Sequence, residues 1–281
     1  LLVAAGLKYI QIGSFVHPEW VPQMADTDDL IRLILPLKDV VLTGLVLNLQ
    51  GLDRALDSGI TNVGMVISAS DAHSRRNVNR PLEEALSEGV ELISETKQAG
   101  LRVRGTVSCS FGCVYEGTVP EDRVISILGA MAEAGADEVC LADTTGMGNP
   151  IQVRRLCRRA LESFPETIVP LHLHDTRGLG LANILAAWEV GIRHFDVCAG
   201  GLGGCPFVKG AAGNVSTEDA VNMFEEIGVK TGIDLKKLCA VVDVLESLLG
   251  RELPGRLNRV IKAGQDRERD AGRAFDKKNQ Q

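Results

Sequence analysis

The chain has 281 residues, of which 45% are hydrophobic, and a formal net charge of −7. This length and composition suit one large domain with its own hydrophobic core. Acidic and basic residues are spread along the chain and no apolar run approaches the roughly 20 residues that cross a bilayer, so neither nucleic acid nor a membrane is expected as a partner.

Five copies of one local pattern predict the order of the elements. In each copy a small or polar residue precedes a glycine, and an apolar stretch follows. Glycine adopts a positive φ angle at little cost, so each copy predicts a helix that ends at the glycine and a strand directly after it. The copies are AAGLKYIQI (4–12), DSGITNVGM (57–65), QAGLRVRGT (98–106), EAGADEVCL (133–141) and EVGIRHFDV (189–197).

Short apolar stretches alternate with helical ones along the whole chain. Segments 81–98 and 120–134 have helical spacing and begin with proline, which the first helical turn tolerates, and a further helix is predicted over 234–249. Such alternation is typical of a parallel sheet with right-handed crossover connections. The strands are predicted at 7–12, 40–46, 62–68, 101–108, 136–142, 168–174 and 193–198.

Two architectures fit this alternation, an open doubly wound sheet and a closed (β/α)8 TIM barrel. Because the alternation runs through the chain with no second domain, we favour the α/β class and the TIM barrel. An eight-stranded barrel needs one more strand, and the first repeat copy already begins at a helix end. We therefore expect strand 1 and the start of helix 1 upstream of the sequence, a TIM-barrel domain lacking strand 1 over 1–264, and a flexible charged tail over 265–281.

The seven cysteines are odd in number and scattered, which predicts reduced thiols rather than a disulfide framework. No secretion signal is visible, so a cytoplasmic location is expected. Cys205 is set in a glycine-rich loop, whereas the other cysteines fall in strand or helix patterns.

The segment LHLHDTRG (171–178) places two of the chain's five histidines one residue apart. On a strand, residues i and i+2 face the same side, so His172 and His174 should point together near the end of the strand that carries a barrel's active site. They form either a metal site or a hydrogen-bonded pair. Asp175 follows them, and it either orients a ligating imidazole or caps the next helix.

The segment AGGLGGCPFVKGAAGN (199–214) follows the next predicted strand and contains six glycines. Such a loop lets backbone approach a ligand closely, and Gly203 and Gly204 are candidate substrate contacts. A merely flexible loop is the alternative. Cys205 in this loop is a candidate acid, base or nucleophile, and Asn214 offers a neutral oxygen ligand.

The part of this loop from 201 to 214, GLGGCPFVKGAAGN, resembles the signature loop of the 3-hydroxy-3-methylglutaryl-CoA (HMG-CoA) lyases, which belong to the metal-dependent lyase and synthase barrels. The resemblance continues along almost the whole chain. It is carried by GSFVHPEWVPQMAD (13–26), RVRGTVSCSFGCVYEG (102–117), LADTTGMGNP (141–150) and GNVSTEDAVNMFEEIGVKTGIDL (213–235).

This resemblance implies a divalent cation, Mg²⁺ or Mn²⁺, held by two histidines, an asparagine and an aspartate. His172, His174 and Asn214 match the first three ligands. The family's aspartate and a neighbouring arginine belong to strand 1, which this sequence does not contain. Cys205 matches the catalytic cysteine, and Asp143 matches a carboxylate near the substrate, for which hydrogen bonding to Thr144 or to loop amides is the alternative role.

The implied reaction cleaves HMG-CoA, an acyl-CoA thioester, to acetyl-CoA and acetoacetate, a step of leucine degradation, in an enzyme that forms a homodimer. Arg104 is expected either to bind substrate or to form a structural ion pair inside the barrel. Gln11 stands where the family usually has glutamate, and His17 where it has a small residue, so both are candidate substrate contacts that put the methylglutaryl group in question. A sister lyase for another 3-hydroxy-3-alkyl acyl-CoA, a condensing acyltransferase and a non-catalytic binding barrel are the alternatives.

Overall fold

Seven strands pair in the order in which they occur along the chain, from β1 to β7, and every pairing is parallel. The structure, a computed structural model, describes residues 1–35, 37–204 and 213–264. The strands are β1 (Tyr9–Ser14), β2 (Val41–Leu45), β3 (Asn62–Ser68), β4 (Arg102–Ser108), β5 (Glu138–Asp143), β6 (Leu171–Leu173) and β7 (Phe195–Asp196).

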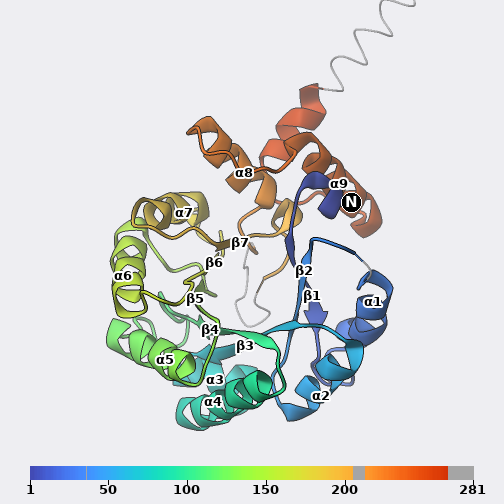
Figure 1. The fold of residues 1–281 in the computed structure, drawn as a ribbon. Coiled ribbons are helices and arrows are strands. Elements are labelled where there is room, and N and C mark those ends of the chain that lie inside the picture. Colours follow the sequence, from blue (N-terminus) through green and yellow to red (C-terminus); the bar gives the residue numbers. More distant parts are fainter. Residues whose placement is uncertain (36, 205–212, 265–281) are drawn as a thin grey trace, which may run out of the picture. The chain divides into compact units, whose positions relative to one another are not determined.

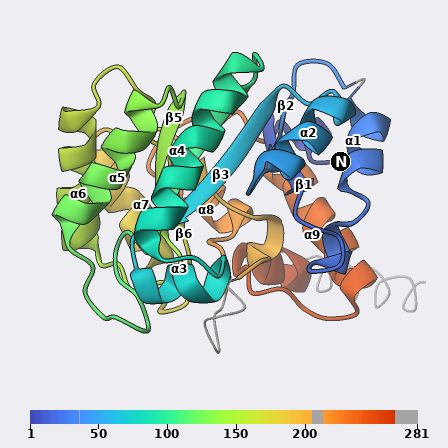
Figure 2. The same ribbon diagram turned by 90° about the horizontal axis from the view of Figure 1, so that it is seen from below.

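Helices connect these strands and lie outside them (Figure 1). They are α1 (Thr27–Ile34), α2 (Leu49–Ser58), α3 (Asp71–Asn77), α4 (Leu82–Gln98), α5 (Glu121–Glu133), α6 (Pro150–Ser163) and α7 (Gly180–Glu189), with a short 3-10 turn η2 (Pro22–Met24) before α1. Figure 2 shows α4 running alongside β3, and α3 lying across the end at which β3 finishes. This is the α/β TIM-barrel arrangement that the repeat predicts.

The chain divides into two compact units. Of the described residues, the barrel unit contains those of Leu7–Asp196 together with Gly204 and Gly213, and therefore all seven strands. The helical unit contains Leu1–Gly6, Val197–Gly203 and the described residues from Asn214 to Gly264. Its elements are η1 (Val3–Ala5), η3 (Ala199–Gly201), α8 (Thr217–Glu226) and α9 (Leu235–Leu249).

The five repeat glycines all have positive φ angles, between 82° and 115°, as the helix-to-strand reading requires. The two proline-initiated helices are also confirmed, because α4 follows Pro81 and α5 follows Pro120. The strand boundaries agree closely for β3 and β4. The predicted eighth strand upstream of the sequence stays a prediction.

β6 and β7 are much shorter than the sequence predicts. β6 spans Leu171–Leu173 rather than 168–174, because Pro170 has no N–H to donate, and Ile168 pairs with β5 only through an isolated bridge. β7 spans Phe195–Asp196 rather than 193–198. In the helical unit, Cys198 instead forms an isolated parallel bridge to Ser216.

The core of the barrel unit lies between the strands and the surrounding helices. On β3 and β4 every second residue is buried, and the residues between them are largely half-buried. The buried face of β3, with Met65 and Ile67, approaches α4 at Gly89, where a Cβ atom would lie 2.6 Å from Ile67 Cδ1. The opposite face of β4 carries Arg104 and Thr106, which are half-buried.

No disulfide joins the described cysteines, in agreement with the thiol prediction. Among the helices that the structure describes, none is both long enough and apolar enough to cross a bilayer. The tail over 265–281 and Cys205 lie outside the described residues.

Candidate active site

The two histidines of the LHLH segment meet at the end of β6. Nε2 of His172 lies 3.2 Å from Nε2 of His174, and the ring centroids are 5.2 Å apart. The side chains share one face because strand residues two apart point the same way. The structure therefore brings together the pair that the sequence singles out.

His174 is the more enclosed of the two histidines, with 7% of its surface exposed. Burial disfavours the imidazolium, and the neighbouring His172 adds repulsion, so the pKa of His174 falls to about 4. A hydrogen bond with the backbone of Thr144 acts in the opposite direction but is outweighed. At neutral pH His174 is therefore a neutral imidazole that can offer a lone pair.

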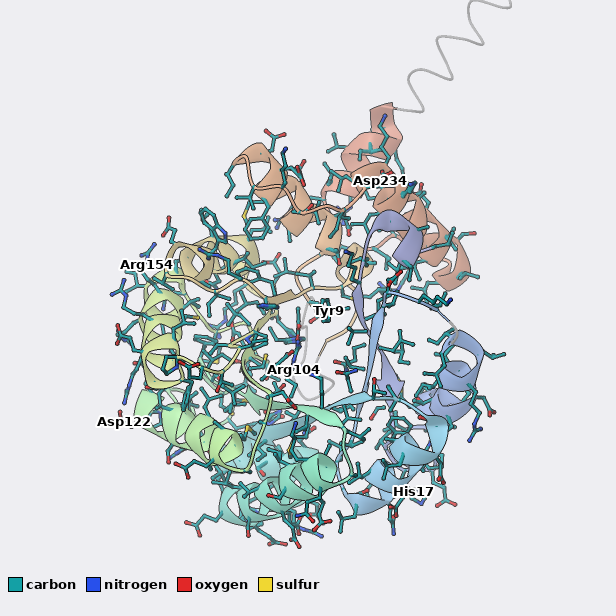
Figure 3. All side chains as sticks on the ribbon, viewed as in Figure 1. Tyr9, His17, Arg104, Asp122, Arg154 and Asp234 are labelled. Carbon is teal, nitrogen blue, oxygen red and sulfur yellow. The ribbon has the colours of Figure 1, made fainter. Side chains whose placement is uncertain are left out.

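Arg104 holds two carboxylates inside the barrel unit. Its Nε donates to Oε2 of Glu138 at 2.6 Å, and its Nη1 donates to both carboxylate oxygens of Asp196 at 2.8 and 3.0 Å. Figure 3 shows Arg104 on the inner side of the curved sheet. Of the two roles expected for Arg104, the structure shows the ion pair.

Asp196 links this ion pair to the histidines. Its Oδ2 atom lies 3.5 Å from Nδ1 of His172. Burial alone would raise the pKa of Asp196, but the hydrogen bond from His172 and the charge of Arg104 outweigh it and bring the pKa to about 2. Asp196 is therefore a carboxylate throughout the neutral range.

Asp143 ends β5 with no exposed surface. Its Oδ1 accepts from the amide of Met147 at 3.0 Å, and its Oδ2 accepts from the amide of Gly148 at 2.9 Å. A Cβ atom at Gly148 would lie 2.9 Å from that same Oδ2, so only glycine lets the backbone come this close. Asp143 therefore forms the hydrogen bonds to loop amides that were the alternative to a role near the substrate.

Burial raises the pKa of Asp143 to about 6, although the backbone amides of Gly148 and Met147 act in the opposite direction. A folded pKa above the unfolded value means that the native state binds the extra proton. The free energy of unfolding contributed by Asp143 should then be largest below about pH 4 and be lost as the pH rises to about 6, by roughly 3 kcal/mol. Urea unfolding of the wild type and of Asp143→Asn at several pH values isolates this contribution; a constant difference between the two proteins from pH 4 to pH 7 would contradict it.

Asp175 lies in the loop between β6 and α7. Its Oδ1 accepts from the amide of Gly180 at 2.7 Å. This bond satisfies one of the amides that a helix leaves unpaired at its first turn. The structure thus shows the capping role for Asp175, and the orienting role stays a prediction.

Asn214 and Gly203 belong to the helical unit. The Asn214 amide nitrogen donates to the carbonyl of Leu202 at 2.8 Å, while its Oδ1 is buried and unpartnered among the described residues. A Cβ atom on Gly203, whose φ is +93°, would lie 2.5 Å from that amide nitrogen. Gly203 therefore makes room for the amide of Asn214, and its contact with substrate stays a prediction.

Gln11 and His17 are both exposed residues of the barrel unit. Gln11 lies on β1 opposite Thr43 of β2. His17 lies in the turn after β1, where its Nδ1 accepts from the amide of Glu19 at 3.3 Å. Gly204 has a φ of 156°, close to extended backbone. The substrate-binding roles of these three residues stay predictions.

Within the part of the chain that the structure describes, no group of three or more His, Cys, Asp or Glu side chains is placed to hold a metal ion.

Residues 1–245, most of the chain, match the family described as HMGL-like. The chain belongs to the HMGL-like family, which includes the HMG-CoA lyases.

Relatives of known structure and activity agree with this family. The crystal structure of an HMG-CoA lyase from Bacillus subtilis has a TM-score of 0.89 and 41% identity, with 93% of this chain and 88% of that one covered. An (R)-citramalyl-CoA lyase of Chloroflexus aurantiacus is 43% identical over 90% of this chain and 83% of its own length. A lyase structure from Acinetobacter baumannii, in complex with coenzyme A and 3-methylmalate, has a TM-score of 0.87 and 42% identity over 92% of this chain and 84% of that one.

The sequence reasoning missed two carboxylates of this HMGL-like site, Glu138 and Asp196. Asp196 stands in the last repeat copy, EVGIRHFDV, as an acidic residue between the apolar Phe195 and Val197 of a predicted strand. An ionised side chain there needs a partner, since a charge is costly to bury alone. An acidic residue at this position therefore indicates an ion pair. Its partner Arg104 is 92 residues away in the sequence and could be identified only from the structure.

Proposed function

We propose that this chain is a divalent-metal-dependent lyase that cleaves HMG-CoA to acetyl-CoA and acetoacetate. The observation that carries the proposal is the pair of Nε2 atoms of His172 and His174, 3.2 Å apart at the end of a barrel strand. Membership of the HMGL-like family and the named activities of the relatives support the substrate class, an acyl-CoA thioester.

The residues of the barrel unit fit a divalent cation. The Nε2 atoms of His172 and His174 lie close enough together that both would hold one cation. The low pKa of His174 keeps that imidazole unprotonated, as a ligand must be. Mixed nitrogen and oxygen donors suit Mg²⁺ or Mn²⁺.

The family resemblance makes Asn214 the candidate for the third ligand. Its Oδ1 is buried without a hydrogen-bond partner among the described residues, while its amide nitrogen is fixed by the carbonyl of Leu202. A buried acceptor without a partner costs free energy unless a ligand satisfies it. We therefore propose the amide oxygen of Asn214 as a ligand of the cation.

The bound cation would polarise the tertiary hydroxyl of the substrate and hold the oxygen atoms beside it. The hydroxyl loses its proton to a protein base, and the bond between C2 and C3 breaks as the hydroxyl oxygen forms the ketone of acetoacetate. The electron pair of that bond passes to the thioester as an enolate. Cys205 would then give a proton to its carbon, releasing acetyl-CoA. Asp143, with a pKa of about 6, is suited to accept or orient the hydroxyl proton.

A second candidate is a lyase for another 3-hydroxy-3-alkyl acyl-CoA. The citramalyl-CoA lyase relative is as similar to this chain as the HMG-CoA lyases are. Citramalyl-CoA differs from HMG-CoA by one methylene between the carbinol carbon and the carboxylate, a change that a pocket distinguishes by only about 1–3 kcal/mol. We assign the selection between HMG-CoA and citramalyl-CoA to the exposed residues Gln11 and His17.

The deciding experiment offers both thioesters to the protein with Mg²⁺ or Mn²⁺ and measures acetyl-CoA together with the oxo acid. We expect acetyl-CoA and acetoacetate in equal amounts and a higher kcat/KM for HMG-CoA. A higher kcat/KM for citramalyl-CoA, with pyruvate as co-product, would favour the second candidate. In a separate incubation with acetyl-CoA and an oxo acid, release of free CoA would indicate a condensing acyltransferase. No product from either thioester would contradict the lyase proposal.

A further inference from the structure

The two nitrogens of the His172 ring face different kinds of neighbour. Nε2 faces the Nε2 atom of His174 at 3.2 Å. Nδ1 faces Oδ2 of Asp196 at 3.5 Å. His172 and Asp196 lie opposite each other in the register of β6 and β7, so this pairing is built into the sheet.

The chemistry of these neighbours decides where the His172 proton sits. An ionised carboxylate can only accept hydrogen bonds, so the ring nitrogen that faces Asp196 must carry the proton. In a neutral imidazole the other nitrogen then carries the lone pair. The proton therefore lies on Nδ1, and Nε2 is free to act as a ligand on the side of His174.

The Asp196 carboxylate is itself held from the opposite side. Nη1 of Arg104 donates to both of its oxygens, and Nε of the same guanidinium donates to Glu138. One cation thus faces two carboxylates, and the group carries one excess negative charge beside His172. This charge favours a cation near the ring, and the fork of Arg104 fixes the position of the carboxylate.

We propose that Asp196, clamped by Arg104, is a positioning residue that sets the tautomer of His172 and thereby prepares its Nε2 atom for the metal. The inference rests on the proposed metal-dependent function. A purely structural ion pair would stabilise the fold but would leave the tautomer and the metal affinity unchanged when it is altered.

Asp196→Asn tests the proposal because the amide cannot satisfy both neighbours as the carboxylate does. Arg104 can only donate, so the amide oxygen must face Arg104 and the NH2 group must face His172. Nδ1 of His172 then becomes the acceptor, and the proton moves to Nε2, which can no longer bind a metal. Glu138→Gln is the matched control, since it removes the same charge from the same arginine without touching His172.

Two measurements on the full chain give the answer. Proton–nitrogen correlation spectra of the metal-free, ¹⁵N-labelled protein report the tautomer of each histidine, with His172 assigned from the spectrum of His172→Gln. Titration with Mn²⁺ alone gives the metal affinity, and thermal unfolding shows that each variant is folded. We expect the Nδ1–H tautomer in the wild type and in Glu138→Gln, the Nε2–H tautomer in Asp196→Asn, and an Mn²⁺ affinity about 10- to 100-fold lower in Asp196→Asn than in the control.

An Nε2–H tautomer of His172 in the wild type would overturn the inference, and this result does not require any variant to fold. Equal losses of Mn²⁺ affinity in Asp196→Asn and Glu138→Gln would also overturn it, because charge alone would then explain the effect. If the wild type binds no Mn²⁺, the proposed function fails, while the tautomer spectra still decide whether Asp196 positions His172.

Discussion

Replacing His174 with alanine is expected to abolish measurable Mn²⁺ binding and to lower kcat/KM by about 10³-fold. The physical reason is the loss of one of the three ligands that this chain would supply. A metal acting on the substrate oxygens contributes several kcal/mol to the transition state, and each 1.36 kcal/mol corresponds to about tenfold in rate. Equilibrium titration with Mn²⁺ and steady-state kinetics with HMG-CoA measure the two effects.

The control for this substitution is His194→Ala. His194 is exposed and stands just before β7, so the same change of side chain should leave metal binding and turnover near wild-type values. Thermal unfolding of both variants separates a loss of ligand from a loss of fold. Metal binding by folded His174→Ala at wild-type affinity would rule out His174 as a ligand.

Replacing Cys205 with alanine is expected to lower kcat by about 10²- to 10⁴-fold with little change in KM. In the proposed reaction the thiol gives a proton to the enolate carbon, so its contribution appears in the transition state and not in substrate binding. The measurement is steady-state kinetics with the thioester that the protein prefers. Binding of Mn²⁺ should be unchanged, because the thiol is not a proposed ligand.

Cys198→Ala is the matched control for Cys205, since it removes a half-buried thiol seven residues earlier in the chain. Its kcat should stay close to that of the wild type. A parallel rise of KM and fall of kcat in Cys205→Ala would point to a role in shaping the loop. Equal defects in both variants would mean that the loss of any thiol in this region disturbs the protein.

Much of this fold can be predicted from local sequence because its units repeat. The glycine that ends each helix needs a positive φ, and this requirement is visible in the sequence at Gly59, Gly100 and Gly135 without knowledge of the fold. The ends of β6 and β7 could not be predicted in the same way. Their lengths depend on which neighbour supplies hydrogen bonds, and apolar residues such as Val169 extend beyond the pairing.

The candidate site likewise has a part that local sequence predicts and a part that depends on distant strands. Two-residue periodicity is local, so the meeting of His172 and His174 could be predicted from their spacing alone. The clamp on Asp196 depends on three strands, since Arg104 lies on β4 and Glu138 on β5. No local pattern relates these residues, and only the pairing of strands brings them together.

The most direct test of the account is a crystal structure of the protein grown with Mn²⁺, with the ion located by its anomalous scattering. We predict one strong peak within bonding distance of Nε2 of His172 and Nε2 of His174. A peak bound to other side chains, or none near the two imidazoles, would contradict the claim that these two histidines hold one catalytic cation.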